Sequence, residues 1–271
     1  MEKITWTWET WKEMWVASLY KQIEYLKTTK ILYIDRFWGN DYFHIGDSYA
    51  CGDNDMVESK RYYYKYILSC LESYSIYKKS KYPNLAREFY PPFDAILGGY
   101  LFAATLSDKE NILKELGEVM ECFKKKEEIT DTYAYHIGYA IKYFLSDDFT
   151  RAKEHIMQAH VKNDYKDVIF GILDKNIQLI DTAIQRVINI HKRSNNKDTI
   201  FHTYSIEATA LAKLAMMYGL EPDVSSPFIH KGLLEKTEGI EYEGIEEITS
   251  ALEEANRRAG SLGSKISGWF K

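Results

Sequence analysis

The stretch Thr7–Thr28, TWETWKEMWVASLYKQIEYLKT, decides the fold class. Apolar side chains recur along it at steps of three and four, namely Trp8, Trp11, Trp15, Leu19, Ile23 and Leu26. That spacing puts them on one face of an α-helix, because a helix turns once in about 3.6 residues. We therefore expect an amphipathic helix here, with its tryptophan stripe packed in the core. An exposed aromatic platform is the alternative.

Similar helical periodicity continues through the chain, and no alternating strand pattern lasts for more than a few residues. Further helices are predicted at 56–79, 93–106, 107–126, 131–145, 149–160, 164–170, 175–192, 204–218, 226–234 and 245–258. Short connections between helices of similar length favour antiparallel neighbours. The sequence thus predicts an all-α fold of about ten helices, packed as stacked antiparallel helical hairpins.

One predicted helix start has a capping signature. Ser107-Asp108-Lys109-Glu110 places a serine in the N-cap position and a glutamate three residues later. In a capping box each of these two side chains accepts a hydrogen bond from a backbone N–H of the other residue. We therefore expect a helix to begin at Ser107 and to run to about Lys126.

The length of 271 residues suits one large domain or two small ones, and 45% hydrophobic residues can form a sizeable core. We expect a single all-α domain over 1–271. Prolines at 83, 91 and 92 mark a soft subdivision near 81–92. The tail, 259–271, is rich in glycine and serine, and we expect it to be flexible.

Composition narrows the expected surroundings and partners of the chain. The net charge of -5 argues against nucleic-acid binding, which needs a basic surface. Three widely spaced cysteines favour free thiols over disulfides. The longest uncharged apolar run, 95–107, has 13 residues, whereas a membrane span needs about 20. Without a signal-peptide pattern at the start, we expect a soluble cytoplasmic protein that contacts no membrane.

Helical periodicity breaks between Phe37 and Asp55, where Gly39, Gly46 and Gly52 punctuate the sequence. We expect a long loop here, and long loops often carry function. Its acidic and aromatic members are the candidate partner-binding residues: Trp38, Asp41, Tyr42, Asp47, Tyr49, Asp53 and Asp55. Against a nuclease with a basic groove, the aspartates could imitate phosphates. The alternative is a loop that folds back on the helices through its aromatic side chains.

Patterns that carry catalysis or hold metals are missing from the sequence. His155 and His160 are five residues apart, which is not the spacing that puts two ligands on one helix face. Asp53-Asn54-Asp55 lacks the glycine and the glutamate of a calcium loop. The chain also has no nucleophile elbow and no phosphate-binding loop. We therefore predict no catalytic residues, no cofactor and no metal.

A resemblance enters near the C-terminus, in Tyr204–Leu220, YSIEATALAKLAMMYGL, and Ser225–Leu234, SSPFIHKGLL. A helix of small residues, a glycine turn, a serine-containing linker and a leucine pair follow one another there. This order resembles the C-terminal signature of the immunity protein 49 family. The region is also similar to immunity proteins of polymorphic nuclease toxins, through His191, Tyr204 and Glu207-Ala208.

The resemblance implies a cytoplasmic all-α protein that is encoded beside a polymorphic toxin. Such a protein binds its cognate toxin domain, a nuclease for example, and neutralises it by occluding the active site, without catalysis of its own. Two other hypotheses remain. An all-α enzyme could reverse the toxin's modification, which would require clustered acidic metal ligands. A helical scaffold could bind peptides, which would require a regular repeat. The oligomeric state is left open.

Overall fold

The computed structural model describes residues 6–28, 39–79, 99–119, 133–159, 164–194, 200–251, 253–255 and 257–258. Every regular element within these ranges is a helix, which confirms the predicted all-α class. None of the described helices is both long and apolar enough to cross a lipid bilayer. The predicted subdivision near 81–92 and the tail at 259–271 lie outside the described residues.

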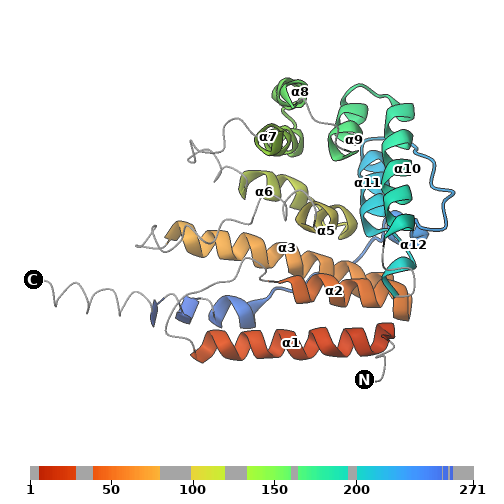
Figure 1. Cartoon of the computed structure of the whole chain (residues 1–271). Coiled ribbons are helices and arrows are strands. Elements are labelled where there is room, and N and C mark those ends of the chain that lie inside the picture. Colours follow the sequence, from red (N-terminus) through yellow and green to blue (C-terminus); the bar gives the residue numbers. More distant parts are fainter. Residues whose placement is uncertain are drawn as a thin grey trace, which may run out of the picture.

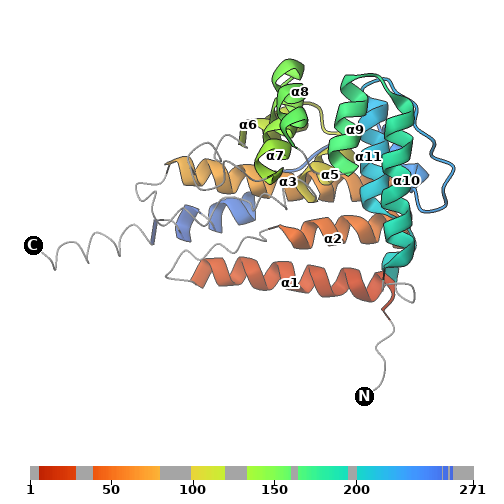
Figure 2. The ribbon, with the colours of Figure 1, turned by 45° about the horizontal axis from the view of Figure 1, so that its top comes forward.

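The helices form a stack with a second group across one end (Figure 1). From one side to the other, the stack consists of α1 (Trp8–Thr28), α2 (Asn40–Ser48), α3 (Met56–Lys79), α5 (Leu101–Leu106), α6 (Ile112–Val119), α7 (Tyr133–Leu145) and α8 (Phe149–Gln158). The group across the end contains α9 (Asp164–Leu173), α10 (Ile177–Arg193) and α11 (Ile206–Met217), followed by the short α12 (Lys231–Leu234). Figure 2, with the top turned forward, shows the same arrangement.

Consecutive helices pack against each other in several places, as α1 does on α2, α2 on α3, α7 on α8 and α9 on α10. Two of these connections are short and capped. Asp148 accepts a hydrogen bond from the Arg151 N–H at the start of α8, and Asn176 accepts one from the Leu179 N–H at the start of α10. A capped start leaves fewer backbone donors unsatisfied, so each turn leads directly into its helix.

The tryptophan stripe of α1 packs against the rest of the protein, but its three tryptophan side chains remain partly exposed to solvent. Ile23 and Leu26 near its end are buried, whereas Trp8, Trp11 and Trp15 are half-buried. The Trp11 ring meets Phe201 with centroids 4.6 Å apart, and the Trp15 ring stacks on His44 at 4.3 Å. The stripe is thus a packing face against α2 and the turn near residue 201.

The prediction of a loop over Phe37–Asp55 is wrong for residues 40–53. Residues Asn40–Ser48 form α2, and Tyr49–Asp53 form a π-helical turn. Gly46 looked like a helix breaker in the sequence, but it allows close packing instead. A Cβ added to Gly46 would lie 3.1 Å from the Tyr63 ring of α3, so any larger residue would push this ring away by a few tenths of an ångström.

Helix α11 lies at the centre of the fold. All residues from Ala208 to Ala215 are buried, and the helix packs on α5, α9, α10 and α12. A helix that is apolar all round belongs in a core, and small alanine side chains let its neighbours approach closely. The charged Lys213 lies within this buried stretch and therefore needs a partner inside the protein.

The capping-box prediction at Ser107 is wrong as well. Ser107 ends α5, with its N–H donating to the Ala103 carbonyl, and the next helix starts only at Ile112. Between them, Asp108 and Asn111 have φ angles of 58° and 63°. Aspartate and asparagine tolerate this left-handed region better than most residues, so the pair makes a tight turn between two helices. The predicted helix end near Lys126 lies outside the described residues.

Candidate functional site: a pocket above buried lysines

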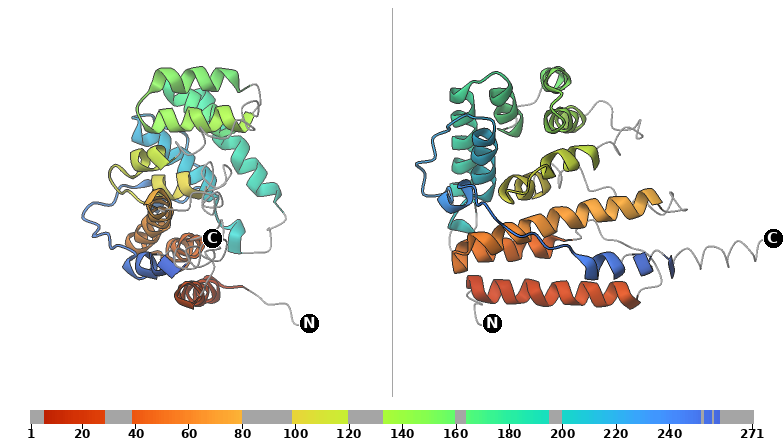
Figure 3. Two further views of the ribbon diagram at one scale, coloured as in Figure 1. Left: turned by 90° about the vertical axis from the view of Figure 1, so that its left-hand side faces the viewer. Right: turned by 180° about the vertical axis from the view of Figure 1, so that it is seen from behind.

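A pocket of about 870 Å³ opens where the turn between α5 and α6 meets the end of α11. Its third side is the segment 235–245, here called the strap, which has no regular secondary structure. Figure 3 shows the strap as the blue trace that leaves α12 and runs beside α3. The pocket is lined by Ala104, Asp108, Lys109, Glu110, Asn111, Leu113, Lys213, Met216, Met217, Leu234, Glu235, Lys236, Thr237, Glu238, Gly239, Ile240 and Tyr242.

Basic side chains of α3 hold the strap in place. The Lys60 ammonium donates to the Glu235 carbonyl at 2.5 Å and to the Thr237 hydroxyl at 2.7 Å. The next residue of α3, Arg61, donates from Nε to the Glu241 carbonyl at 2.9 Å. These contacts give the strap's backbone acceptors partners that a regular helix would otherwise supply. The wall of the pocket is therefore fixed by side chains of a neighbouring helix.

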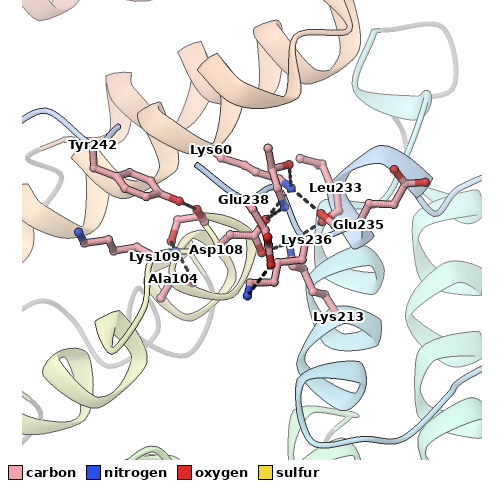
Figure 4. Close-up of polar contacts among 12 residues, drawn as sticks. Lys60, Ala104, Asp108, Lys109, Lys213, Leu233, Glu235, Lys236, Glu238 and Tyr242 are labelled. Atoms are coloured by element: carbon pink, nitrogen blue, oxygen red, sulfur yellow. Dashed lines mark hydrogen bonds and ion pairs between the residues drawn. The ribbon is translucent and has the colours of Figure 1, made fainter. Parts of the chain in front are cut away.

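Three charged side chains converge beneath the pocket (Figure 4). Lys60 comes from α3, Lys213 from α11 and Asp108 from the turn between α5 and α6. The Asp108 carboxylate lies 2.6 Å from the Lys60 ammonium and 2.5 Å from the Lys213 ammonium, one on each oxygen. It also accepts a hydrogen bond from the Thr237 N–H at 3.0 Å. Asp108 thus joins three parts of the chain that are distant in sequence.

The cluster of Lys60, Asp108 and Lys213 is buried and carries unequal charges. The side chains are 0%, 5% and 3% exposed, respectively. Two ammonium groups share one carboxylate, so the cluster has one excess positive charge when both lysines are protonated. The Leu233 carbonyl accepts a hydrogen bond from Lys213 at 2.8 Å, which partly replaces lost hydration. Burying a charged group costs free energy because the group loses its hydration, and here the single Asp108 carboxylate must compensate two buried ammonium groups.

This imbalance affects the proton affinity of Lys213. Burial lowers the pKa of Lys213 from 10.5 to about 8; the Asp108 carboxylate counteracts this effect and the Lys60 ammonium adds to it. Between pH 8 and 10 the unfolded chain therefore binds more protons at this lysine than the folded chain does. Below pH 8 Lys213 is protonated in the folded chain, and its buried charge lowers the free energy of unfolding most there. As the pH rises above 8, Lys213 loses its proton in the folded chain and this loss of stability becomes smaller.

We therefore expect the contribution of Lys213 to stability to increase from pH 8 to pH 10. The measurement is urea unfolding of the wild type and of Lys213→Met at several pH values, with the difference between the two taken at each pH. Buried tyrosines such as Tyr63 have raised pKa values because of desolvation, but they act above pH 10 and are common to both proteins. A difference that stays constant from pH 8 to 10 would contradict the expectation.

Five of the residues predicted to bind a partner lie on α2 and the π-helical turn, and none of the five lines this pocket: Asp41, Tyr42, Asp47, Tyr49 and Asp53. Asp41 and Tyr42 are buried, with Tyr42 packed on α3. Asp47 is only 14% exposed on its side chain. Its carboxylate accepts hydrogen bonds from the Tyr63 hydroxyl at 2.7 Å and the Tyr204 hydroxyl at 3.2 Å. These three residues therefore serve the packing of α2.

The other predicted residues also have partners within the chain. Tyr49 is half-buried and stacks on Tyr62, with the Lys12 ammonium 4.6 Å from its ring centroid. Asp53 is exposed and forms an ion pair with the same Lys12. Asp55 accepts a hydrogen bond from the Glu58 N–H at 3.0 Å, at the start of α3. Trp38 lies outside the described residues. The described aspartates thus do not form a row of unpaired surface charges that could imitate phosphates.

The pocket residues were not among the predicted sites, although one signal was present. Lys213 stands alone in ATALAKLAMM, where every other residue from 208 to 217 is small or uncharged. A charge in such a run must find a buried partner, but nothing in the local sequence says that this partner is Asp108. Among the described residues, no three histidine, cysteine or acidic side chains gather into a potential metal site.

Compared with known proteins, the chain matches no family model, no curated protein and no solved structure.

Proposed function

We propose that this chain is an immunity protein, which binds a bacterial toxin domain in the cytoplasm and blocks its active site. The observation that carries the proposal is the place of the segment Tyr204–Leu234. This segment resembles immunity-protein families in sequence, and its residues Lys213, Met216, Met217 and Leu234 form one wall of the pocket. The resemblance and the pocket therefore meet on the same part of the surface.

The rim of the pocket has the chemistry of a protein contact. Met216 and Met217 are 41% and 52% exposed, although they directly follow the fully buried part of α11. Methionine side chains are flexible and polarizable, and they are common on surfaces that bind other proteins. Exposed apolar side chains beside a hollow also favour the insertion of an anchoring side chain from a partner. We infer that the toxin contacts this rim.

The expected contact with the toxin is therefore at the pocket and not on α2. The sequence predicts an acidic loop at 37–55 that could fill a basic groove. In the folded chain, Asp41 is buried and the carboxylates of Asp47, Asp53 and Asp55 have internal partners. Taking them away from these partners would cost stability on binding. The exposed methionines carry no such cost.

Co-expression tests the proposal. The chain is produced in bacteria together with the C-terminal domain of the protein encoded immediately upstream, and growth is measured alongside size-exclusion chromatography of the purified mixture. Rescued growth together with a stable complex is the expected result. Rescue without a complex would favour an enzyme that reverses the damage, and growth arrest despite a folded chain would contradict toxin neutralisation.

Substitution at the rim tests the proposed contact. The double variant Met216→Lys, Met217→Lys places two charges where an apolar anchor is expected. We expect it to weaken the complex on the order of a hundredfold, because hot-spot residues commonly contribute this much. Met157→Lys is the matched control, since Met157 is 66% exposed on α8 and does not line the pocket. Equal affinities of the two variants, measured by calorimetry, would remove the rim from the interface.

A further inference from the structure

The pocket has one feature that the proposed function does not use, which is the excess positive charge beneath it. Lys60 is satisfied, because its ammonium contacts the Asp108 carboxylate, the Glu235 carbonyl and the Thr237 hydroxyl. Lys213 differs. It lines the pocket and donates to Asp108 and to the Leu233 carbonyl, so two acceptors serve its three N–H donors.

Besides Asp108 and Lys213, the charged side chains that line the pocket are Lys109, which is half-buried, and Glu110, Glu235, Lys236 and Glu238, which are exposed. Glu238 and Lys236 at the mouth are 83% and 73% exposed and form an ion pair with each other. Charges in contact with water are strongly screened, whereas buried charges act through a lower effective dielectric constant. The surplus ammonium charge of Lys60 and Lys213 therefore favours a negative group at the pocket floor.

A helix end adds to this preference. The residues at the start of α6 that border the pocket are Glu110, Asn111 and Leu113. The first backbone N–H groups of a helix have no acceptor within the helix, and the helix dipole is positive there. In α6 the Ile112 N–H donates to the Lys109 carbonyl and the Glu115 N–H to the Asn111 carbonyl, so the contribution of this helix end is that of its dipole.

The remaining walls describe the rest of the ligand. Met216 and Met217 from α11, Leu113 from α6 and Ile240 from the strap present apolar surface. A volume of about 870 Å³ is within the range of small-molecule and peptide-side-chain pockets, about 300–1,000 Å³. A single excess charge matches a monoanion better than a doubly charged phosphate. A carboxylate on an apolar body has this combination of single charge and apolar surface.

We propose that this pocket binds a carboxylate-bearing ligand with an apolar chain, and that Lys213 holds the carboxylate. The ligand chemistry has two sources, a free carboxylic acid or the C-terminal carboxylate of a polypeptide. The proposal does not depend on toxin neutralisation, because it concerns the chain alone and can be tested without any toxin.

Calorimetric titration of the purified chain tests the proposal with two matched pairs of probes. Hexanoate is compared with hexanamide, and the acetylated tripeptide Leu-Leu-Leu with a free carboxylate is compared with its amide. We expect each acid to bind on the order of ten to a hundred times more tightly than its amide, because the amide loses a charge-assisted hydrogen bond. A stronger response to hexanoate would identify a small acid as the ligand, and a stronger response to the peptide would identify a chain end.

Two variants locate the binding. Lys213→Met removes the ammonium and is expected to abolish the difference between acid and amide. Met217→Glu leaves the buried cluster intact and adds a negative charge at the mouth, so it is expected to weaken both acids. Met157→Glu on α8 is the control and should bind like the wild type. Acids and amides that bind equally, or acids that bind Lys213→Met as well as the wild type, would overturn the proposal.

Discussion

Replacing Asp108 by asparagine is expected to lower the free energy of unfolding by about 3–5 kcal/mol, the usual cost of removing one partner from a buried ion pair. The shape of the side chain is kept, and asparagine also tolerates the left-handed φ of 58° at this position. The change therefore removes only the charge. Lys60 and Lys213 would then be two buried ammonium groups without a counter-ion.

The substitution of the partner Lys213 should change stability much less. Lys213→Met leaves one ammonium, Lys60, on one carboxylate, Asp108, and it continues the apolar surface of α11. We expect a change in unfolding free energy within about 1 kcal/mol, because replacing surplus buried charge by apolar volume is often neutral or stabilising. Urea denaturation measures both variants, with Glu110→Gln in the same turn as the exposed control. A loss from Lys213→Met that equals the loss from Asp108→Asn would show that the excess charge is misassigned.

Asp47→Ala is expected to lower the free energy of unfolding by about 2 kcal/mol, since a buried hydroxyl that loses its acceptor costs about 1–3 kcal/mol. The Tyr63 and Tyr204 hydroxyls both donate to this carboxylate. They are 3.4 Å from each other, so one of them can partly replace the lost acceptor with its neighbour. The expected loss of unfolding free energy therefore corresponds to about one hydroxyl group without an acceptor, and not to two.

The prediction separates a packing role of Asp47 from a role in imitating phosphate. Asp53→Ala is the matched control, because Asp53 is exposed and its ion pair with Lys12 contributes at most about 1 kcal/mol. Thermal and urea unfolding of both variants, beside their affinity for the toxin domain, gives the answer. If Asp47→Ala left the stability unchanged but abolished toxin binding, the toxin interface would lie on α2 and not at the pocket.

The sequence was informative wherever helical periodicity was strong. The steps of three and four along 7–28 predicted α1, and the helical pattern over 149–160 predicted α8. Periodicity failed at Gly46, because a glycine that admits the Tyr63 ring looks the same in sequence as a glycine that ends a helix. The contact that distinguishes them comes from α3, seventeen residues later in the chain.

The pocket could not be predicted for the same physical reason. Its charged cluster joins residues 60, 108 and 213. The uncharged run around Lys213 indicates that this lysine needs a buried partner, but nothing in the sequence near residues 60 and 108 identifies them as its neighbours. Ser107–Glu110 matches a capping box, yet tertiary packing ends α5 at this serine and turns Asp108 inward. Local capping contributes only about 1 kcal/mol, which is less than the cost of leaving two buried ammonium groups unpaired.

The most direct measurement of the central claim is hydrogen exchange of the chain with and without the upstream toxin domain. The N–H groups of Ser107, Lys109, Glu235 and Thr237 donate hydrogen bonds. The other amides of the strap, 235–245, and of the turn at 107–111 lie outside regular helices, so we expect them to exchange more readily in the unbound chain. If the toxin binds at the pocket rim, these amides become protected in the complex while those of Asn40–Asp53 stay unchanged. Protection confined to Asn40–Asp53, or no change anywhere despite saturating toxin, would contradict binding at the pocket.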